Sequence, residues 1–205
     1  VTGVQTCALP ISGYSCGDVS KESDVLRAFE KMDNELGGID VLISNAGISI
    51  RSDFTDITYE QWKKVIDINL NGMFLCAREA ARRMAEKKSG VILMTASTNG
   101  TEGHRWYTDY NASKAGVILL TKSMALELAP HVRVNCVCPG YVLTPMQRAE
   151  YTDEMLAKVN EGIPMKRHAE PAEIGALYAF LASDEAKYIT GADIRIDGGE
   201  TAGLY

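Results

Sequence analysis

Short apolar runs alternate along the chain with longer segments in which apolar residues recur at helical spacing. Strands are predicted over residues 40–45, 90–95, 132–138 and 192–197. The first two runs are apolar almost throughout, which is typical of strands buried on both faces of a parallel sheet. A weaker run predicts another strand over residues 13–18.

Helical patterns separate these runs. The predicted helices cover residues 20–36, 58–88, 107–129 and 171–182. Ser20 is a plausible N-cap of the first, Thr58 and Gln61 fit a capping box in the second, which we expect to be bent, and Pro171 suits a first helical position. Strands that alternate with helices predict a doubly wound α/β fold with a parallel sheet.

Composition narrows the class of protein. The chain has 205 residues, 46% hydrophobic residues and a net charge of −6, which fits one ordinary domain and gives no electrostatic support for nucleic-acid or anionic-membrane binding. No apolar run approaches the roughly 20 residues of a membrane span. The five cysteines are irregularly spaced without a C-x-x-C motif, and the three histidines lie far apart. We therefore expect a reduced, cytoplasmic protein without a metal site.

Polar and small residues follow three of the predicted strands. Asn45, Ala46 and Gly47 follow the first, Ser97 follows the second, and Pro139 with Gly140 ends the third. Ligands of open parallel sheets bind outside the carboxyl ends of the strands. The sequence therefore predicts a binding site along this edge.

Tyr110 and Lys114 are four residues apart on a predicted helix, which places them on one face. A phenol has a pKa of about 10, and a nearby ammonium lowers it. The pair can therefore serve as a general acid/base for a carbonyl or alcohol oxygen, which Ser97 could also hydrogen-bond. The alternatives are a solvated helix face for the pair and a backbone cap for Ser97, with Thr95 and Thr98 as competing neighbours.

Together these residues resemble the short-chain dehydrogenase/reductase family. Asn45 to Gly47, Ser97, Tyr110-x-x-x-Lys114, Asn135 and Pro139-Gly140 stand in the family's order and approximate spacing, and the resemblance covers residues 13–199. It implies a Rossmann-like domain over residues 12–205. It also implies an oxidoreductase that transfers a hydride between NAD or NADP, with NAD slightly preferred, and a carbonyl or secondary alcohol.

The resemblance assigns roles to single residues. Tyr110 is the general acid/base, Lys114 lowers its pKa and binds the nicotinamide ribose, Ser97 orients the substrate oxygen, and Asn69 holds a water in a proton relay. The expected cofactor site comprises Tyr110 and Lys114 together with Asp18, Val19, Asn45, Ala46, Gly47, Pro139, Gly140, Val142 and Thr144. Within it, Asp18 contacts adenine and Thr144 binds the carboxamide.

Several assignments have structural alternatives. Asp18 could cap a strand end, and Asn71 lies close enough to Asn69 to be confused with it. Asn135 is interpreted as a structural bridge between strands. Other residues without an assigned role are interpreted as follows: Cys136 and Cys138 as core, and Trp106 and Tyr107 as either pocket or core.

The beginning of the sequence departs from the family pattern. Residues 1–11 resemble a translated sequencing adapter, with an ordinary disordered terminus as the alternative. The family's glycine-rich phosphate loop, T-G-x-x-x-G-x-G, does not occur in the 205 residues, and the first βαβ unit is missing. We therefore expect this polypeptide to bind the dinucleotide poorly. A tight dissociation constant measured on it would contradict that expectation.

The substrate pocket is expected to be formed by residues 98–109 and 141–166. A small polyol, diol or hydroxyketone is the preferred substrate, and 3-oxoacyl-acyl-carrier-protein reduction is the alternative. A non-catalytic nucleotide-binding protein and an inert fragment are the rivals from other classes. The resemblance also implies a homo-oligomer, a tetramer or dimer, formed through the helix of Tyr110 and the helix from Pro171.

Overall fold

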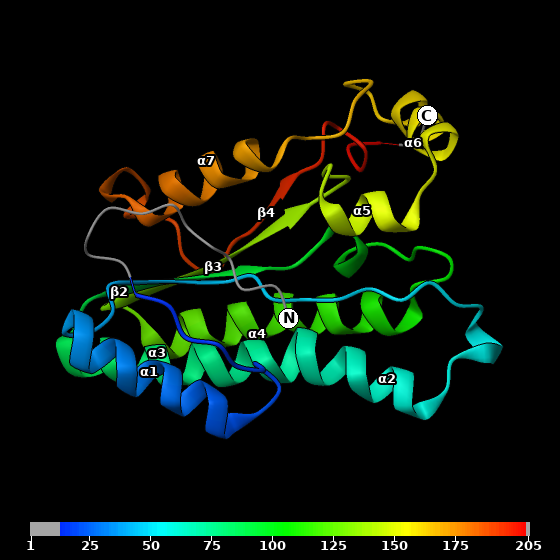
Figure 1. The fold of residues 1–205 in the computed structure, drawn as a ribbon. Helices are drawn as coiled ribbons and strands as arrows, with labels where there is room; N and C mark the ends of the chain where they lie inside the picture. Colours follow the sequence, from blue (N-terminus) through cyan, green and yellow to red (C-terminus); the bar gives the residue numbers. More distant parts are fainter. Residues whose placement is uncertain (1–12, 204–205) are drawn as a thin grey trace.

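The computed structural model describes residues 13–203. This part of the chain forms one parallel sheet with the strand order β1-β2-β3-β4. The strands are β1 (Val41–Ser44), β2 (Gly90–Thr95), β3 (Val132–Pro139) and β4 (Asp193–Ile196). The sheet lies between a layer that contains α1 to α4 and a second layer that contains α7 (Figure 1). The predicted Rossmann-like α/β fold is confirmed.

The four predicted helices are present. The helices are α1 (Glu22–Leu36), α2 (Tyr59–Ile66), α3 (Gly72–Lys87), α4 (Thr108–Leu128), α5 (Pro145–Glu150), α6 (Asp153–Gly162) and α7 (Pro171–Ala182), with 3-10 turns η1 (Phe54–Asp56), η3 (Thr98–Gly100) and η4 (Asp184–Ala186). The predicted helix over 58–88 consists of α2, a π-helical segment η2 (Asp67–Asn71) and α3. A π-helical segment widens the helix locally and often marks a functional site.

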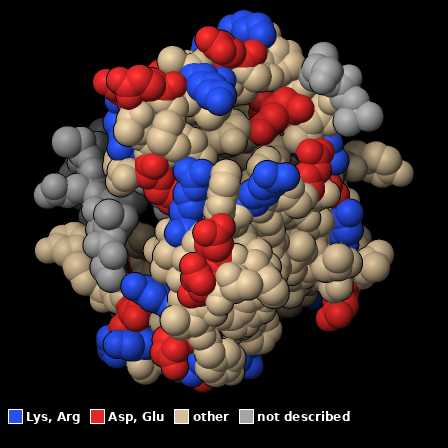
Figure 2. All heavy atoms as spheres, turned by 90° about the vertical axis from the view of Figure 1, so that its right-hand side faces the viewer, with Lys and Arg blue, Asp and Glu red and all other residues tan. Residues whose placement is uncertain are grey.

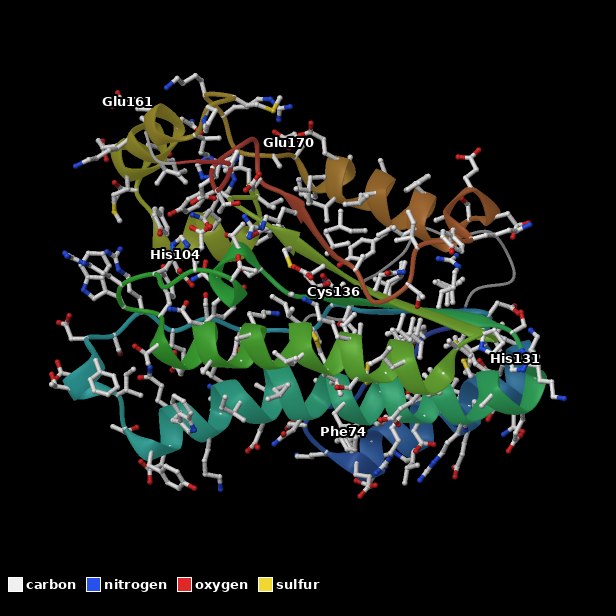
Figure 3. All side chains as sticks on the ribbon, turned by 180° about the vertical axis from the view of Figure 1, so that it is seen from behind. Phe74, His104, His131, Cys136, Glu161 and Glu170 are labelled. Atoms are coloured by element: carbon white, nitrogen blue, oxygen red, sulfur yellow. The ribbon has the colours of Figure 1, made fainter. Side chains whose placement is uncertain are left out.

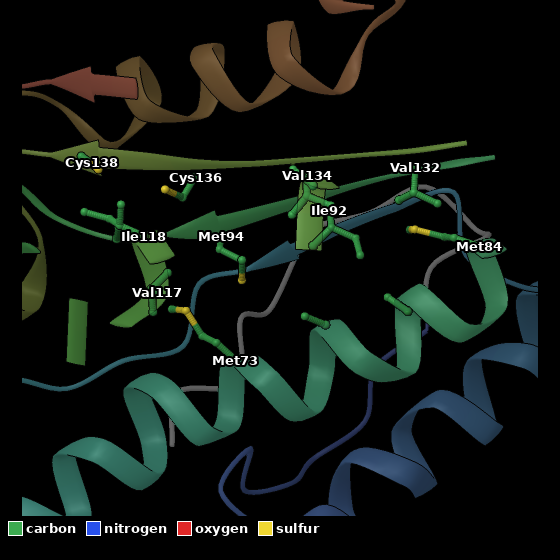
Figure 4. Close-up of a cluster of buried hydrophobic side chains, with 14 of the residues drawn as sticks. Met73, Met84, Ile92, Met94, Val117, Ile118, Val132, Val134, Cys136 and Cys138 are labelled. Atoms are coloured by element: carbon green, nitrogen blue, oxygen red, sulfur yellow. The ribbon is translucent and has the colours of Figure 1, made fainter. Parts of the chain in front are cut away.

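The central strand β2 is buried on both faces because its side chains alternate between two cores. Ile92 and Met94, both fully buried, pack with α1, α3, α4 and alternate residues of β3 (Figure 4). Val91 and Leu93 point the other way and pack with α7. Cys136 and Cys138 lie in the first core with no exposed surface, which confirms their interpretation as core residues.

The interpretation of Asn135 as a structural bridge agrees with its contacts. Its side chain is fully buried on β3. The amide donates to the carbonyl oxygen of Ile189 at 2.9 Å and accepts from the backbone N–H of Ala192 at 3.0 Å. Asn135 therefore holds the segment that leads into β4.

Three local predictions were wrong. Residues 13–18 form no strand, because their backbone has no ladder partner and the Tyr14 carbonyl accepts from Lys31 at 2.7 Å instead. The predicted burial of β1 on both faces fails, since Val41 and Ile43 are 37% and 46% exposed. Within the described residues β1 is the sheet edge, and α7 covers β2 and β3 instead. Finally, Ser20 does not cap α1, whose N-cap position is Lys21.

Candidate active site

The carboxyl ends of β1, β2 and β3 meet at one edge of the sheet, and a pocket of about 100 Å³ opens there. Ser97, Tyr110 and Gly140 line it together. The other lining residues are Ser49, Thr98, Asn99, His104, Tyr107, Tyr141, Gln147, Glu150, Tyr151 and Glu200. The strand order thus brings three of the predicted site residues, from separate parts of the sequence, to one cavity.

Asp109 fixes the first turn of α4, from which Tyr110 projects. Its carboxylate is fully buried, accepts from the Tyr110 backbone N–H at 2.8 Å and accepts from the Gln61 amide of α2 at 2.9 Å. An acidic side chain satisfies the unpaired N–H groups at a helix N-terminus. The start of α4, and with it Tyr110, is therefore tied to α2.

Tyr110 departs from the expected electrostatics. Burial raises its pKa to about 12, the Ser97 hydroxyl opposes that rise, and the negative charge of Glu150 adds to it. Lys114 is not among the causes of this shift, and its expected lowering of the Tyr110 pKa stays a prediction. The Lys114 ammonium lies 5.5 Å from the centre of the Tyr110 ring and donates to a backbone carbonyl instead. Desolvation of the phenolate therefore dominates.

Lys114 is a buried cation that leaves two of its N–H donors unused among the described residues. Lys114 is 3% exposed, and burial lowers the pKa of its ammonium to about 8. Within residues 13–203 its ammonium makes one hydrogen bond, to the Thr95 carbonyl oxygen at 2.8 Å. Because an ammonium has three donors, two remain for a bound molecule with hydroxyl or other acceptor oxygens, such as the ribose of a dinucleotide.

Asn69 lies in the π-helical segment and faces the same region. Its fully buried amide accepts from the Ile48 N–H and donates to the Ile48 carbonyl, both at 2.8 Å, and it reaches Ser113 of α4 at 3.2 Å. Asn71, by contrast, is exposed. The structure therefore selects Asn69 as the inward asparagine, with a clear structural use for its side chain.

Gly47 lies next to both the Asn69 amide and the Lys114 ammonium. A side chain there would begin 3.4 Å from the Asn69 amide oxygen and 3.5 Å from the Lys114 ammonium. Glycine therefore keeps space open beside the buried cation, which fits the passage of a cofactor along this loop. Asn45, two residues earlier, accepts from the Thr95 hydroxyl at 2.7 Å.

Ser97 has the backbone contact predicted as its structural alternative, and its role toward a substrate oxygen stays a prediction. Its hydroxyl accepts from the Asn99 N–H at 3.2 Å and so caps η3, while the same oxygen influences the Tyr110 phenol. The Thr95 hydroxyl is directed elsewhere, to Asn45 and to the Tyr178 hydroxyl at 2.5 Å. Thr98 is 2% exposed and also lines the pocket.

The remaining predicted cofactor residues do not line this pocket. Asp18 accepts from the Ser20 N–H and hydroxyl at 3.0 and 2.7 Å, which lowers its pKa. Because no strand ends there, Asp18 is not a strand-end cap and instead stabilises the turn before α1. Val19 packs against Gly72. A Cβ added at Gly72 would lie 2.8 Å from the Val19 side chain and 3.1 Å from the Val19 carbonyl oxygen. Thr144 caps α5 through the Gln147 N–H at 3.3 Å.

The residues at and just after the end of β3 lie between the pocket and β4. Val142 forms an isolated parallel bridge with Ala169. Pro139 ends β3, and the Gly140 N–H donates to the Ile196 carbonyl at 3.1 Å. A side chain at Gly140 would begin 2.8 Å from atoms of Asp197 and Glu200, so glycine permits this close approach.

Residues of both segments that were predicted to form the pocket do line it, but the two acidic residues of the lining were not predicted. Glu150, at the end of α5, accepts from the Ser49 hydroxyl and from Tyr107 at 2.9 Å. Tyr107 therefore belongs to the pocket, whereas Trp106 is 43% exposed and stacks with the Arg51 guanidinium at 4.2 Å. Glu200 also lines the pocket, and it lies outside the two predicted segments. The Asp-Gly-Gly turn before it is the one signal in the sequence that could have identified it.

The described residues form no potential metal cluster and no helix that could span a membrane. Residues 13–203 contain no group of three or more potential metal-ligating side chains, and His104 and His131 lie at opposite ends of the molecule (Figure 3). None of the described helices has the length and hydropathy needed to cross a bilayer. Acidic and basic side chains are interspersed on the face that carries α5 and α6 (Figure 2).

Comparison with known proteins gives consistent matches over most of the chain. Residues 7–201 match the family model described as enoyl-(acyl carrier protein) reductase. The chain is 39% identical to the 3-oxoacyl-(acyl-carrier-protein) reductase FabG of Staphylococcus epidermidis over 183 residues, which are 89% of this chain and 75% of the relative.

Solved structures agree. A short-chain type dehydrogenase/reductase from Mycobacterium marinum superposes with a TM-score of 0.87 at 39% identity, covering 92% of this chain and 75% of that one. A gluconate 5-dehydrogenase from Burkholderia cenocepacia J2315, in complex with NADP and tartrate, gives a TM-score of 0.88 at 28% identity, covering 93% and 75%.

Proposed function

Because this chain belongs to the short-chain dehydrogenase/reductase family, we propose that it transfers a hydride between a nicotinamide dinucleotide and a ketone or secondary alcohol. The observation that carries the proposal is the convergence of Ser97 and Tyr110 on one pocket, with the buried Lys114 ammonium one helical turn behind. In reduction, a bound reduced nicotinamide supplies the hydride to the carbonyl carbon.

The protein's own residues manage the carbonyl oxygen. Ser97 donates a hydrogen bond to it, and Tyr110 delivers the proton that completes the alcohol. Lys114 donates its two remaining N–H groups to the dinucleotide ribose, beside the space that Gly47 leaves open. We assign Asn45, Ala46, Pro139, Gly140, Val142 and Thr144 to the nicotinamide half of the cofactor, and Asp18 and Val19 to the adenine half.

The state of Tyr110 favours carbonyl reduction at neutral pH. With a pKa raised to about 12, the phenol holds its proton and is ready to act as an acid. Alcohol oxidation needs the phenolate, so its rate should rise with pH while reduction changes little. A pH profile of both directions tests this assignment.

The pocket lining favours a hydroxylated substrate. Among the described residues the lining carries hydroxyl, amide, imidazole and carboxylate groups and contains no Val, Leu, Ile or Met. A small hydroxyketone, or the corresponding polyol or diol, fits such a lining better than an acyl chain does. The second candidate is 3-oxoacyl thioester reduction, which the similarity to FabG favours.

The decisive experiment is a substrate panel. We expect the purified full-length gene product to oxidise NADH or NADPH with hydroxyketones, and to do so more efficiently than with 3-oxoacyl thioesters. NAD remains the predicted cofactor over NADP, to be tested by comparing kcat/KM. A protein that binds dinucleotide without turnover of any ketone or alcohol would support the rival non-catalytic role.

We further propose that the protein is a cytoplasmic homo-oligomer. Leu119 and Leu126 on α4 are 64% and 84% exposed, and Phe180 on α7 is 39% exposed, so both helices present apolar surface that an oligomer would cover. Light scattering coupled to gel filtration should give the mass of a dimer or tetramer.

A further inference from the structure

Two carboxylates line the pocket, and they are used differently. Both oxygens of Glu150 are occupied, one by the Ser49 hydroxyl and the other by Tyr107 at 2.9 Å. The Glu200 carboxylate receives no hydrogen bond from the described part of the chain, and its Oε2 is buried without a partner. Glu150 is therefore held within the protein by both oxygens. In Glu200 the Oε2 atom is closed off against Gly140, and Oε1, which is neither buried nor paired with a described residue, is the acceptor open to a ligand.

A rigid turn places Glu200 at the pocket wall. The Asp197 carboxylate accepts from the Gly199 N–H and the Thr201 N–H, both at 3.0 Å, and from the Thr201 hydroxyl at 2.6 Å. Gly198 and Gly199 have φ values of +64° and +87°, which favour glycine. The position of Glu200 is thus determined by a turn with its own hydrogen bonds.

The surroundings of the turn hold it from the other side. Gly199 lies against Pro164, and a side chain at Gly198 would begin 2.9 Å from Ile163. The Met165 N–H donates to the Gly198 carbonyl at 3.2 Å. Glu200 therefore cannot withdraw easily from Gly140, against which its Oε2 is packed.

Burial and the neighbouring charges of Asp197 and Glu102 raise the pKa of Glu200 to about 7, so the carboxylate is fully charged only above neutral pH. In the charged form, hydroxyl groups of a substrate can donate to its open oxygen, whereas a carboxylate on the substrate is repelled. The described lining contains no lysine or arginine to neutralise such a carboxylate, although the unpartnered amide of Gln147 is an uncharged donor there. Like-charge contacts of this kind are an effective way to reject a competing ligand.

Building on the proposed function, we propose that Glu200 selects uncharged hydroxyketones and excludes keto acids by accepting a hydrogen bond from a substrate hydroxyl. A matched pair of substrates isolates this effect. Dihydroxyacetone and hydroxypyruvate share the ketone and one hydroxymethyl group, and differ in a hydroxymethyl against a carboxylate. At pH 9, where Glu200 is charged, the wild-type full-length gene product should have a kcat/KM at least about tenfold higher for dihydroxyacetone.

Two substitutions separate charge from geometry. Glu200→Gln keeps the shape but removes the charge, and should shift the preference at least about tenfold toward hydroxypyruvate. Glu200→Asp keeps the charge but withdraws the acceptor, so it should weaken dihydroxyacetone use while still rejecting hydroxypyruvate. Glu86→Gln is the matched control, because Glu86 is an exposed carboxylate that does not line the pocket. It should leave the preference unchanged. Thermal melting verifies that each variant folds.

A wild-type preference for hydroxypyruvate, or a preference that Glu200→Gln does not alter, would overturn the proposal. If neither ketone oxidises the reduced cofactor, the proposed function fails, and binding decides the inference separately. Saturation-transfer NMR with the same two molecules should then detect dihydroxyacetone binding that Glu200→Gln weakens. Equal binding of both molecules to the wild type would refute the role of Glu200.

Discussion

Replacing Lys114 with methionine should stabilise the protein at neutral pH while removing a residue of the proposed site. Lys114 is 3% exposed, and burial lowers its pKa from 10.5 to about 8. At roughly 1.4 kcal/mol per pKa unit, the buried ammonium costs about 3 kcal/mol. Loss of the hydrogen bond to Thr95 returns about 1 kcal/mol of that. We therefore expect Lys114→Met to raise the free energy of unfolding by about 2 kcal/mol.

The pH dependence of this difference identifies its cause. Below pH 8 the lysine is protonated in both folded and unfolded states, so the full cost is present. Between pH 8 and 10.5 the unfolded state holds the proton and the folded state does not, so wild-type stability rises with pH. The advantage of Lys114→Met should therefore shrink over this window.

Urea unfolding at pH 7 and at several higher pH values measures the effect. Lys122→Met is the matched control on the same helix, because the Lys122 ammonium is exposed and pairs with Asp193 at 2.8 Å. It should not stabilise the protein. A Lys114→Met variant that is less stable than the wild type at pH 7, or whose advantage does not change with pH, would refute the reasoning.

Two stability predictions and one on pH follow from individual contacts. Asn69→Ala should cost about 1–3 kcal/mol because it strands buried backbone groups of the loop after β1, whereas the exposed Asn71→Ala should cost little; urea unfolding distinguishes them. Gly90→Ala should lower the free energy of unfolding by about 1–3 kcal/mol, because the new Cβ would lie 2.3 Å from Met84. Gly175→Ala in α7 should raise it by up to about 1 kcal/mol, because the new Cβ meets nothing within 4 Å. Equal thermal melting of the two alanine variants would contradict this. The rate of alcohol oxidation should rise with pH, and a pH-independent oxidation rate would contradict the raised pKa of the catalytic phenol.

Much of the fold could be predicted because its signals are local. The apolar run over 90–95 coincides with β2, and Pro171 marks the first residue of α7. Prediction failed where structure depends on partners that the pattern does not specify. Residues 13–18 have strand-like composition but no ladder partner. α5 and α6 were missed because they are short, with 6 and 10 residues, so an apolar period extends over few turns.

In the candidate site, too, local features could be predicted from the sequence and features that depend on distant residues could not. Tyr110 and Lys114 share a helix face by spacing alone, and the strand order brings Ser97 to them. The electrostatic state of Tyr110 could not be predicted, because it depends on burial by distant segments and on Glu150. Glu200 was missed because its importance lies in lacking a hydrogen-bond partner, which only the three-dimensional structure shows.

The most direct test of the central claim is the turnover of Tyr110→Phe. The substitution removes the proton donor and keeps the ring that packs edge-on with Tyr107 at 6.3 Å. Tyr188→Phe, at a fully exposed tyrosine, is the control. Oxidation of the reduced cofactor by the best ketone should fall about 10²–10⁴-fold in Tyr110→Phe and remain unchanged in the control. Turnover of Tyr110→Phe within tenfold of the wild type would contradict the account.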